Sequence, residues 1–329
     1  MSGASGHHRV RLTDLHPSTD AIADELRQGL QADPKWLPSK YFYDAIGSAL
    51  FEQICAAPEY YLTRSECSIL QTQAAAIGAA IGSGVLVVEY GSGSGVKTQL
   101  LLQALPAAVA YAPVEISRAA LLASVAELSA LLPTLEMLPV CGDFTQTFVV
   151  PQPQRPAQRT LIFFPGSTIG NFAQPEAIAL LAQMRREMGA NGAALVGIDL
   201  QKDPKVIEAA YNDAAGVTAR FTLNLLARLN RELGSNFDLQ RFRHRAVYNR
   251  QTERIETDLV SVIAQTVLVD GCAIAFAADE AIRVEISCKY SLHGFGQMAA
   301  QAGLALQQSW TDSAQNFALV LLKPLASLA

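Results

Sequence analysis

The stretch Val85-Leu86-Val87-Val88-Glu89-Tyr90-Gly91-Ser92-Gly93-Ser94-Gly95 decides the fold of this chain. Its first part is an apolar run of strand length that ends in an acidic residue. Its second part carries glycine at alternate positions, and glycine lets a backbone approach a ligand where a Cβ atom would block it. The stretch therefore predicts a buried strand followed by a ligand-binding turn.

Further apolar runs follow, with helix-like segments between most of them: residues 109–115, 135–140, 160–164 and 193–199. This alternation predicts βαβ units and a parallel sheet that is buried on both faces. Residues 305–310 and 316–322 are separated by a turn-like segment and could close the sheet as an antiparallel hairpin. The alternation of apolar runs and helix-like segments changes in residues 201–288, and we interpret these residues as an inserted lobe.

The composition is that of a compact, soluble enzyme. Of 329 residues, 50% are hydrophobic and 17% are charged, which excludes collagen-like, coiled-coil and largely disordered chains. A net charge of -5 argues against a nucleic-acid or anionic-membrane surface. No apolar stretch reaches the roughly 20 residues of a membrane span. Five scattered cysteines without a CxxC motif predict reduced thiols and no metal site. We expect a cytoplasmic monomer.

Residues that follow the next strands suit an adenosyl ligand. The glycines do not match the nicotinamide fingerprint G-x-G-x-x-G, because the third glycine comes one residue early. Glu115 ends the next run, where a carboxylate can accept both hydroxyls of a ribose. Asp143 could accept from an adenine amino group, and Phe144 could lie against the ring. Together these features resemble the S-adenosylmethionine-dependent methyltransferases.

The resemblance implies an α/β fold: a Rossmann-like methyltransferase sheet with a second, inserted α+β lobe that binds the substrate. We expect residues 61–200 plus 289–329 to form the domain that binds S-adenosylmethionine. Residues 9–60 plus 201–288 are expected to form the substrate-binding lobe.

Seven motifs, in order along nearly the whole chain, narrow the resemblance to one family. The chain resembles the histidine-specific α-N-methyltransferases that make trimethylhistidine on the way to ergothioneine. The motifs are residues 40–45 (KYFYDA), 58–64 (PEYYLTR), the glycine loop with Lys97-Thr98, 141–144 (CGDF), 166–171 (GSTIGN), 210–218 (AYNDAAGVT) and 285–289 (EISCK).

The resemblance implies which residues hold the cofactor, S-adenosyl-L-methionine. They are Gly91, Lys97, Glu115, Asp143 and Phe144. Lys97 suits the methionyl carboxylate as a point charge. Glu115 stands where family members often carry Asp, so its reach to the ribose differs by one methylene.

For the substrate, L-histidine, the matched positions are Tyr60, Asn171, Tyr211, Glu285 and Ser287, with Tyr43 as a further candidate. Tyr60, Asn171 and Tyr211 are the expected catalytic residues, because a tyrosine hydroxyl and an amide can hold the amine and the carboxylate. Glu285 and Ser287 are two residues apart in a strand-like run and point to one face.

That spacing lets the carboxylate accept one imidazole N–H while the hydroxyl meets the other ring nitrogen. Thr257 stands where the family carries Met near the imidazole, so we expect a pocket of different shape.

The implied reaction is trimethylation of the α-amino group of histidine, which gives hercynine. No His or Lys at the matched positions is an obvious general base, so positioning is expected to supply most of the rate. Three alternatives stay open: another free aromatic amino acid such as tryptophan, a protein or nucleic acid as acceptor, and a non-catalytic binder of adenosyl ligands. Indole has one N–H and no ring acceptor, so Glu285 with Ser287 favours imidazole.

Overall fold

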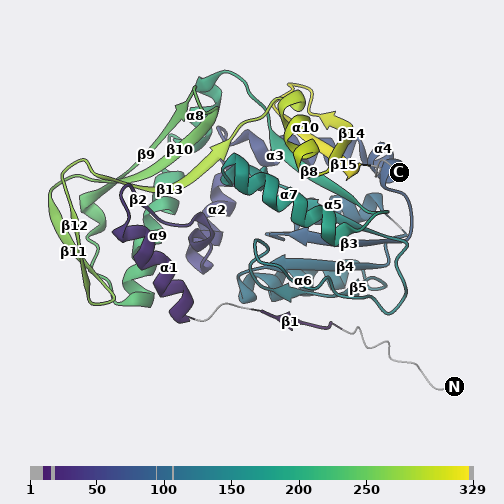
Figure 1. Ribbon diagram of the computed structural model, residues 1–329, viewed down its shortest axis with the longest axis horizontal. Helices are drawn as coiled ribbons and strands as arrows, with labels where there is room; N and C mark the ends of the chain where they lie inside the picture. Colours follow the sequence, from purple (N-terminus) through teal and green to yellow (C-terminus); the bar gives the residue numbers. More distant parts are fainter. Residues whose placement is uncertain (1–9, 16–18, 94, 106, 326–329) are drawn as a thin grey trace.

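A large, mostly parallel sheet forms one side of the molecule (Figure 1). The computed structural model describes residues 10–15, 19–93, 95–105 and 107–325. In this sheet the strands follow the order β1-β6-β4-β3-β7-β8-β15-β14, and β5 pairs with β4. Their bounds are β1 (Thr13–Asp14), β3 (Val85–Tyr90), β4 (Ala110–Glu115), β5 (Glu136–Met137), β6 (Val140–Cys141), β7 (Arg159–Phe164), β8 (Ala193–Asp199), β14 (Leu304–Thr311) and β15 (Phe317–Pro324).

The predicted parallel sheet and its closing hairpin are confirmed. The ladders from β1 to β8 are parallel, whereas β15 runs antiparallel to both β8 and β14. The run at residues 135–140 differs from the prediction, because it divides into β5 and β6. Pro139 stands directly before β6 and has no N–H to donate to a ladder.

Side chains of β3 alternate between two apolar clusters, one on each face of the sheet. Val85 and Val87 belong to the cluster that includes helices α3 (Tyr61–Thr72), α4 (Ala74–Ile81), α5 (Val96–Ala104) and α6 (Arg118–Leu131). Leu86, Val88 and Tyr90 belong to the cluster that includes α7 (Gln174–Met188) and α10 (Leu292–Gln301). Both faces are therefore covered, which is why the strand reads as continuously apolar.

A second, smaller sheet lies at the other side of the molecule, on the left in Figure 1. Its order is β2-β13-β10-β9, and a separate hairpin is formed by β11 and β12. The bounds are β2 (Lys35–Trp36), β9 (Phe242–Asn249), β10 (Arg254–Ser261), β11 (Gln265–Val269), β12 (Cys272–Phe276) and β13 (Ala281–Cys288). The helices and short turns of this part are α1 (Thr19–Gln31), η1 (Ser39–Phe42), α2 (Ala45–Ala56), α8 (Pro204–Tyr211), α9 (Val217–Leu233) and η3 (Leu239–Arg241).

Two contacts among the described residues show how the parts are joined. Thr13–Asp14 pair with β6, so this short strand lies with the large sheet rather than with the lobe to which residues 9–60 are assigned from sequence. At the other end, the chain leaving β13 joins the large sheet, where Tyr290 N donates to Asp199 O at 2.9 Å. The end of β13 is thereby held beside the carboxyl end of β8. No helix within the described ranges has the length and apolar character needed to span a membrane.

Candidate active site

The turn after β3 has the open backbone that its glycines predict. Gly91, Gly93 and Gly95 have φ angles of 74°, 49° and 74°, a region that side chains other than glycine rarely adopt. A Cβ atom on Gly93 would meet nothing within 4 Å. The buried Ser92 hydroxyl has no hydrogen-bond partner among the described residues. The turn thus presents free space and a spare polar atom, which suits a polar ligand.

Glu89, the acid before the turn, faces the protein rather than a ligand. Its carboxylate accepts from Thr98 Oγ1 at 2.7 Å and from Tyr111 Oη at 2.5 Å. Burial raises the pKa of Glu89 to about 8, although both hydrogen bonds lower it. This carboxylate ties the strand to α5 and β4, so its contribution to the loop is structural.

Lys97 reaches the carboxyl end of β7 and pairs with a buried carboxylate that the sequence analysis did not assign. Lys97 Nζ lies 2.7 Å from Glu66 Oε2, which also accepts from Gly166 N at 2.8 Å. Burial lowers the pKa of Lys97, but the Glu66 carboxylate outweighs it and the pKa ends above its ordinary value. Glu66 Oε1 is buried without a partner among the described residues. The region at the carboxyl end of β7 therefore contains the Lys97 ammonium and, in Glu66 Oε1, an acceptor oxygen without a partner among the described residues.

Glu115 and Asp143 stand at the ends of neighbouring strands. Glu115 Oε1 accepts from Ser117 N at 3.0 Å, and burial raises the pKa of Glu115 while backbone N–H groups lower it. Asp143 Oδ1 accepts from Thr145 N at 2.9 Å, and Lys40 Nζ lies 3.1 Å from Asp143 Oδ2. Both carboxylates are thus fixed by local donors before any ligand arrives.

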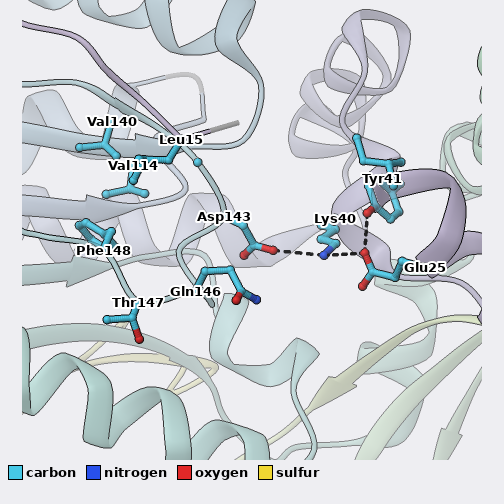
Figure 2. Close-up of a pocket in the computed structure, with 12 residues that line it drawn as sticks. Leu15, Glu25, Lys40, Tyr41, Val114, Val140, Asp143, Gln146, Thr147 and Phe148 are labelled. Carbon is cyan, nitrogen blue, oxygen red and sulfur yellow. Dashed lines mark hydrogen bonds and ion pairs between the residues drawn. The ribbon is translucent and has the colours of Figure 1, made fainter. Parts of the chain in front are cut away.

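A cavity of about 420 Å³ lies beside Asp143 (Figure 2). Val114, Val140 and Phe148 line it from the large sheet and the loop that follows. Across the cavity, Lys40 Nζ bridges Asp143 and Glu25, with 2.8 Å to Glu25 Oε2. The N-terminal segment therefore forms one wall of the space next to the predicted adenine acceptor.

Phe144 packs within an aromatic group. Its ring stacks on Tyr90 with centroids 5.2 Å apart and planes inclined by 14°, and it meets Phe164 and Phe172 edge-on. A Cβ atom on Gly91 would lie 3.9 Å from the Phe144 ring. Phe144 thus borders the glycine turn while also filling the core.

A β-bulge turns Glu285 and Ser287 toward the protein interior. Glu285 pairs with Thr257 and Arg283 pairs with Asp258, so Val284 has no partner across the ladder. Buried positions accordingly change from even numbers (282 and 284) to odd numbers (287 and 289). A bulge re-aims side chains in this way. The predicted pairing of Glu285 and Ser287 on one face agrees with this geometry, although sequence spacing alone does not reveal the bulge.

Glu285 is desolvated by its surroundings. Burial raises its pKa to about 7, and the nearby Lys289 ammonium opposes this rise. Thr257, directly opposite, is fully buried, and its hydroxyl has no hydrogen-bond partner among the described residues. A contact between Thr257 and a substrate stays a prediction.

Three predicted tyrosines, Tyr43, Tyr60 and Tyr211, lie within electrostatic reach of Glu285. Burial raises the pKa of Tyr60 well above its ordinary value, with smaller contributions from Tyr211, Tyr43 and Glu285. Burial also raises the pKa of Tyr43, and both Glu285 and Glu115 add to it. Tyr43 thus lies within electrostatic reach of the acid predicted for the substrate and the acid predicted for the cofactor.

Asn171 closes the turn η2 (Thr168–Asn171), which follows β7 and packs against β13. A Cβ atom on Gly170 would lie 2.9 Å from Cys288 O, so glycine permits this close packing. Asn171 is half-buried at the junction of the two sheets. The turn places Asn171 next to β13, near the end of the strand that also carries Ser287.

Behind Tyr211 and Ser287 lies a buried charge network that the sequence analysis missed. Tyr211 Oη donates to Ser287 Oγ at 2.8 Å, and Lys289 Nζ donates to both oxygens. Lys289 also pairs with Asp199 at 2.9 Å, and both side chains are fully buried. In the sequence, Lys289 stands two residues after Ser287, as Ser287 does after Glu285, and this spacing could have placed Lys289 on the same face of the strand. For Asp199 the sequence gives no indication of this role beyond its position at the end of a predicted strand.

Comparison with known proteins gives a consistent result. A family model described as "Histidine-specific methyltransferase, SAM-dependent" matches residues 22–324. The chain is 41% identical over 310 residues to a histidine N-alpha-methyltransferase of Mycolicibacterium smegmatis, covering 92% of this chain and 95% of that protein. It is 38% identical over 307 residues to a histidine N-alpha-methyltransferase of Mycobacterium tuberculosis, covering 92% and 94%. Ergothioneine biosynthesis protein 1 of Neurospora crassa is 30% identical over 289 aligned residues, and the match covers 84% of this chain and 32% of that protein.

Proposed function

The chain belongs to the histidine-specific, S-adenosylmethionine-dependent methyltransferases, and on this premise we propose that it methylates the α-amino group of free L-histidine. The product after three transfers is hercynine, a step of ergothioneine biosynthesis. The observation that carries the choice of histidine is the bulge in β13, which turns a carboxylate and a hydroxyl to one inward face.

The cofactor assignment rests on the fit of the loop after β3. The positive φ angles of its glycines, the Ser92 hydroxyl without a partner among the described residues and the nearby Lys97 ammonium suit a ligand with several polar groups. We propose that Gly91, Lys97, Glu115, Asp143 and Phe144 hold S-adenosylmethionine. Bound there, it supplies an electrophilic methyl group on a sulfonium sulfur.

The substrate assignment rests on the cluster around β13. We propose that Glu285 accepts a ring N–H and that Ser287 meets the other ring nitrogen. Asn171, Tyr60 and Tyr211 would orient the amine and the carboxylate. Burial raises the pKa of Tyr60 and of Tyr211, so both hydroxyls stay protonated at neutral pH. The Tyr60 hydroxyl can donate to the substrate, whereas the Tyr211 hydroxyl donates to Ser287. The amine must therefore lose its proton to water, and the residues contribute by alignment.

We further propose that the small sheet with α1, α2, α8 and α9 is the substrate-binding lobe, and that the large sheet binds the cofactor. All five cysteines are free thiols, which suits the cytoplasm. A monomer is expected, and light scattering after size exclusion measures it.

The deciding experiment incubates the protein with S-adenosylmethionine and a panel of free amino acids, followed by mass spectrometry. Histidine carrying three added methyl groups is the expected product. Exclusive methylation of tryptophan or another amino acid would contradict the proposal, and so would cofactor binding without any methylated product.

A further inference from the structure

Lys289 uses all of its donors inside the protein. An ammonium has three N–H groups. The three contacts of Nζ are Asp199 Oδ2 at 2.9 Å, Tyr211 Oη at 2.9 Å and Ser287 Oγ at 2.8 Å. Burial lowers the pKa of Lys289, but Asp199 and Tyr211 outweigh it, so the side chain is charged at neutral pH. Lys289 therefore donates to both hydroxyls and accepts from neither.

This arrangement sets the direction of the two hydroxyl groups. Tyr211 and Ser287 are themselves hydrogen-bonded at 2.8 Å, so one hydroxyl hydrogen lies between their oxygens. Each oxygen also accepts from Lys289. Two hydroxyls carry two hydrogens, so one remains for a partner outside the cluster. The Tyr211 hydroxyl donates its hydrogen to Ser287 Oγ. The hydrogen that remains belongs to the Ser287 hydroxyl, so the pair offers one hydrogen-bond donor to a ligand.

Glu285 presents the opposite polarity. An ionised carboxylate only accepts hydrogen bonds. Lys289 lowers the pKa of Glu285 against the effect of burial, and so favours the ionised form. One buried cation thus supports a donor at Ser287 and an acceptor at Glu285, two residues apart on the same strand.

We propose that Lys289 is a positioning residue that fixes the Tyr211–Ser287 pair as a hydrogen-bond donor opposite the Glu285 acceptor. The site then selects a ring with one N–H and one bare nitrogen, bound as a single tautomer. This inference rests on the proposed function, because it concerns the same substrate.

The network also offers a clean variant and a matched control. Without Lys289, Asp199 keeps the Tyr61 hydroxyl at 2.9 and 2.8 Å and Lys202 Nζ at 2.5 Å, so its carboxylate is not left alone. Lys289→Met is therefore expected to fold. Lys202→Met is the control, because its contacts are Tyr61, Asp199 and the Leu200 carbonyl.

Calorimetry with S-adenosylhomocysteine provides the test, with histidine and β-(2-thienyl)alanine as ligands. Thienylalanine has a five-membered ring without nitrogen. Lys289→Met is expected to weaken histidine binding by about 10- to 100-fold, as for a lost hydrogen bond to a charged group. Thienylalanine and S-adenosylhomocysteine should change by less than about threefold. Lys202→Met should leave all three affinities within about threefold.

Tyr211→Phe tests the same idea without changing Lys289. The contact between Lys289 and Ser287 remains, so the ratio of histidine to thienylalanine affinity should stay within about threefold even if both affinities fall. A large fall in the ratio of histidine to thienylalanine affinity in Tyr211→Phe would overturn the proposal. Unchanged histidine binding in Lys289→Met, or an equal loss for all three ligands, would also overturn it. Wild-type protein that fails to bind histidine would instead remove the proposed function.

Discussion

Glu285→Gln should stabilise the protein at alkaline pH. In the folded protein the pKa of Glu285 is raised to about 7 from 4.5, chiefly by burial. Below the unfolded value the carboxyl is protonated in both states and costs nothing. Above about pH 4.5 the unfolded chain ionises this carboxyl while the folded protein keeps it protonated up to about pH 7, so stability is lost between these two pH values and the loss levels off above about 7. One pKa unit corresponds to about 1.4 kcal/mol, which puts the loss between about pH 5 and about pH 8.5 near 2.5 kcal/mol.

The glutamine amide has the same shape and does not ionise, so it avoids this cost. Urea unfolding of wild type and variant, without histidine, measures the free energy of unfolding at both pH values. The advantage of the variant should grow by about 2.5 kcal/mol from about pH 5 to about pH 8.5. Comparing the two proteins cancels the titration of Glu89, whose pKa is also raised. An advantage of equal size at both pH values would refute the reasoning.

Two further substitutions address the cofactor and the pocket. Asp143→Ala should weaken S-adenosylhomocysteine binding by about 0.5–1.5 kcal/mol in calorimetry, through one lost hydrogen bond, while Asp143→Asn keeps an acceptor oxygen and serves as control. Unchanged affinity in folded Asp143→Ala would remove this residue from the site. Thr257→Val replaces by a methyl group a buried hydroxyl that has no partner among the described residues, so the free energy of unfolding without histidine should rise by about 1 kcal/mol. KM for histidine should rise if Thr257 contacts the substrate as predicted, and an unchanged KM would remove Thr257 from the substrate site.

The large sheet could be predicted because its signal is local. Val85, Val87 and their neighbours alternate between two covered faces, so each strand reads as one apolar run. Pro139 interrupts the apolar run at residues 135–140. Whether a proline divides a strand depends on the hydrogen bonds that its neighbours form with other strands, and the sequence does not show these.

The site was less accessible to prediction, because its geometry depends on pairing between distant segments. Val284 becomes a bulge only through the register of β13 against β10, and the sequence pattern of β13 does not show it. The network of Lys289 joins Asp199, Tyr211 and Ser287 from three elements. Glu89 carried the expected acidic signal, yet its partners Thr98 and Tyr111 enclose it.

The most direct test of histidine recognition is kcat/KM for histidine and for tryptophan, measured in wild type and in Glu285→Ala. If Glu285 accepts the imidazole N–H, the variant should lose on the order of 100-fold or more for histidine, because the ring loses its partner. Tryptophan turnover should stay level or rise, because the half-buried, desolvated charge is gone. Equal losses for both substrates would contradict the account, since Glu285 would then support the fold or the cofactor instead of the imidazole.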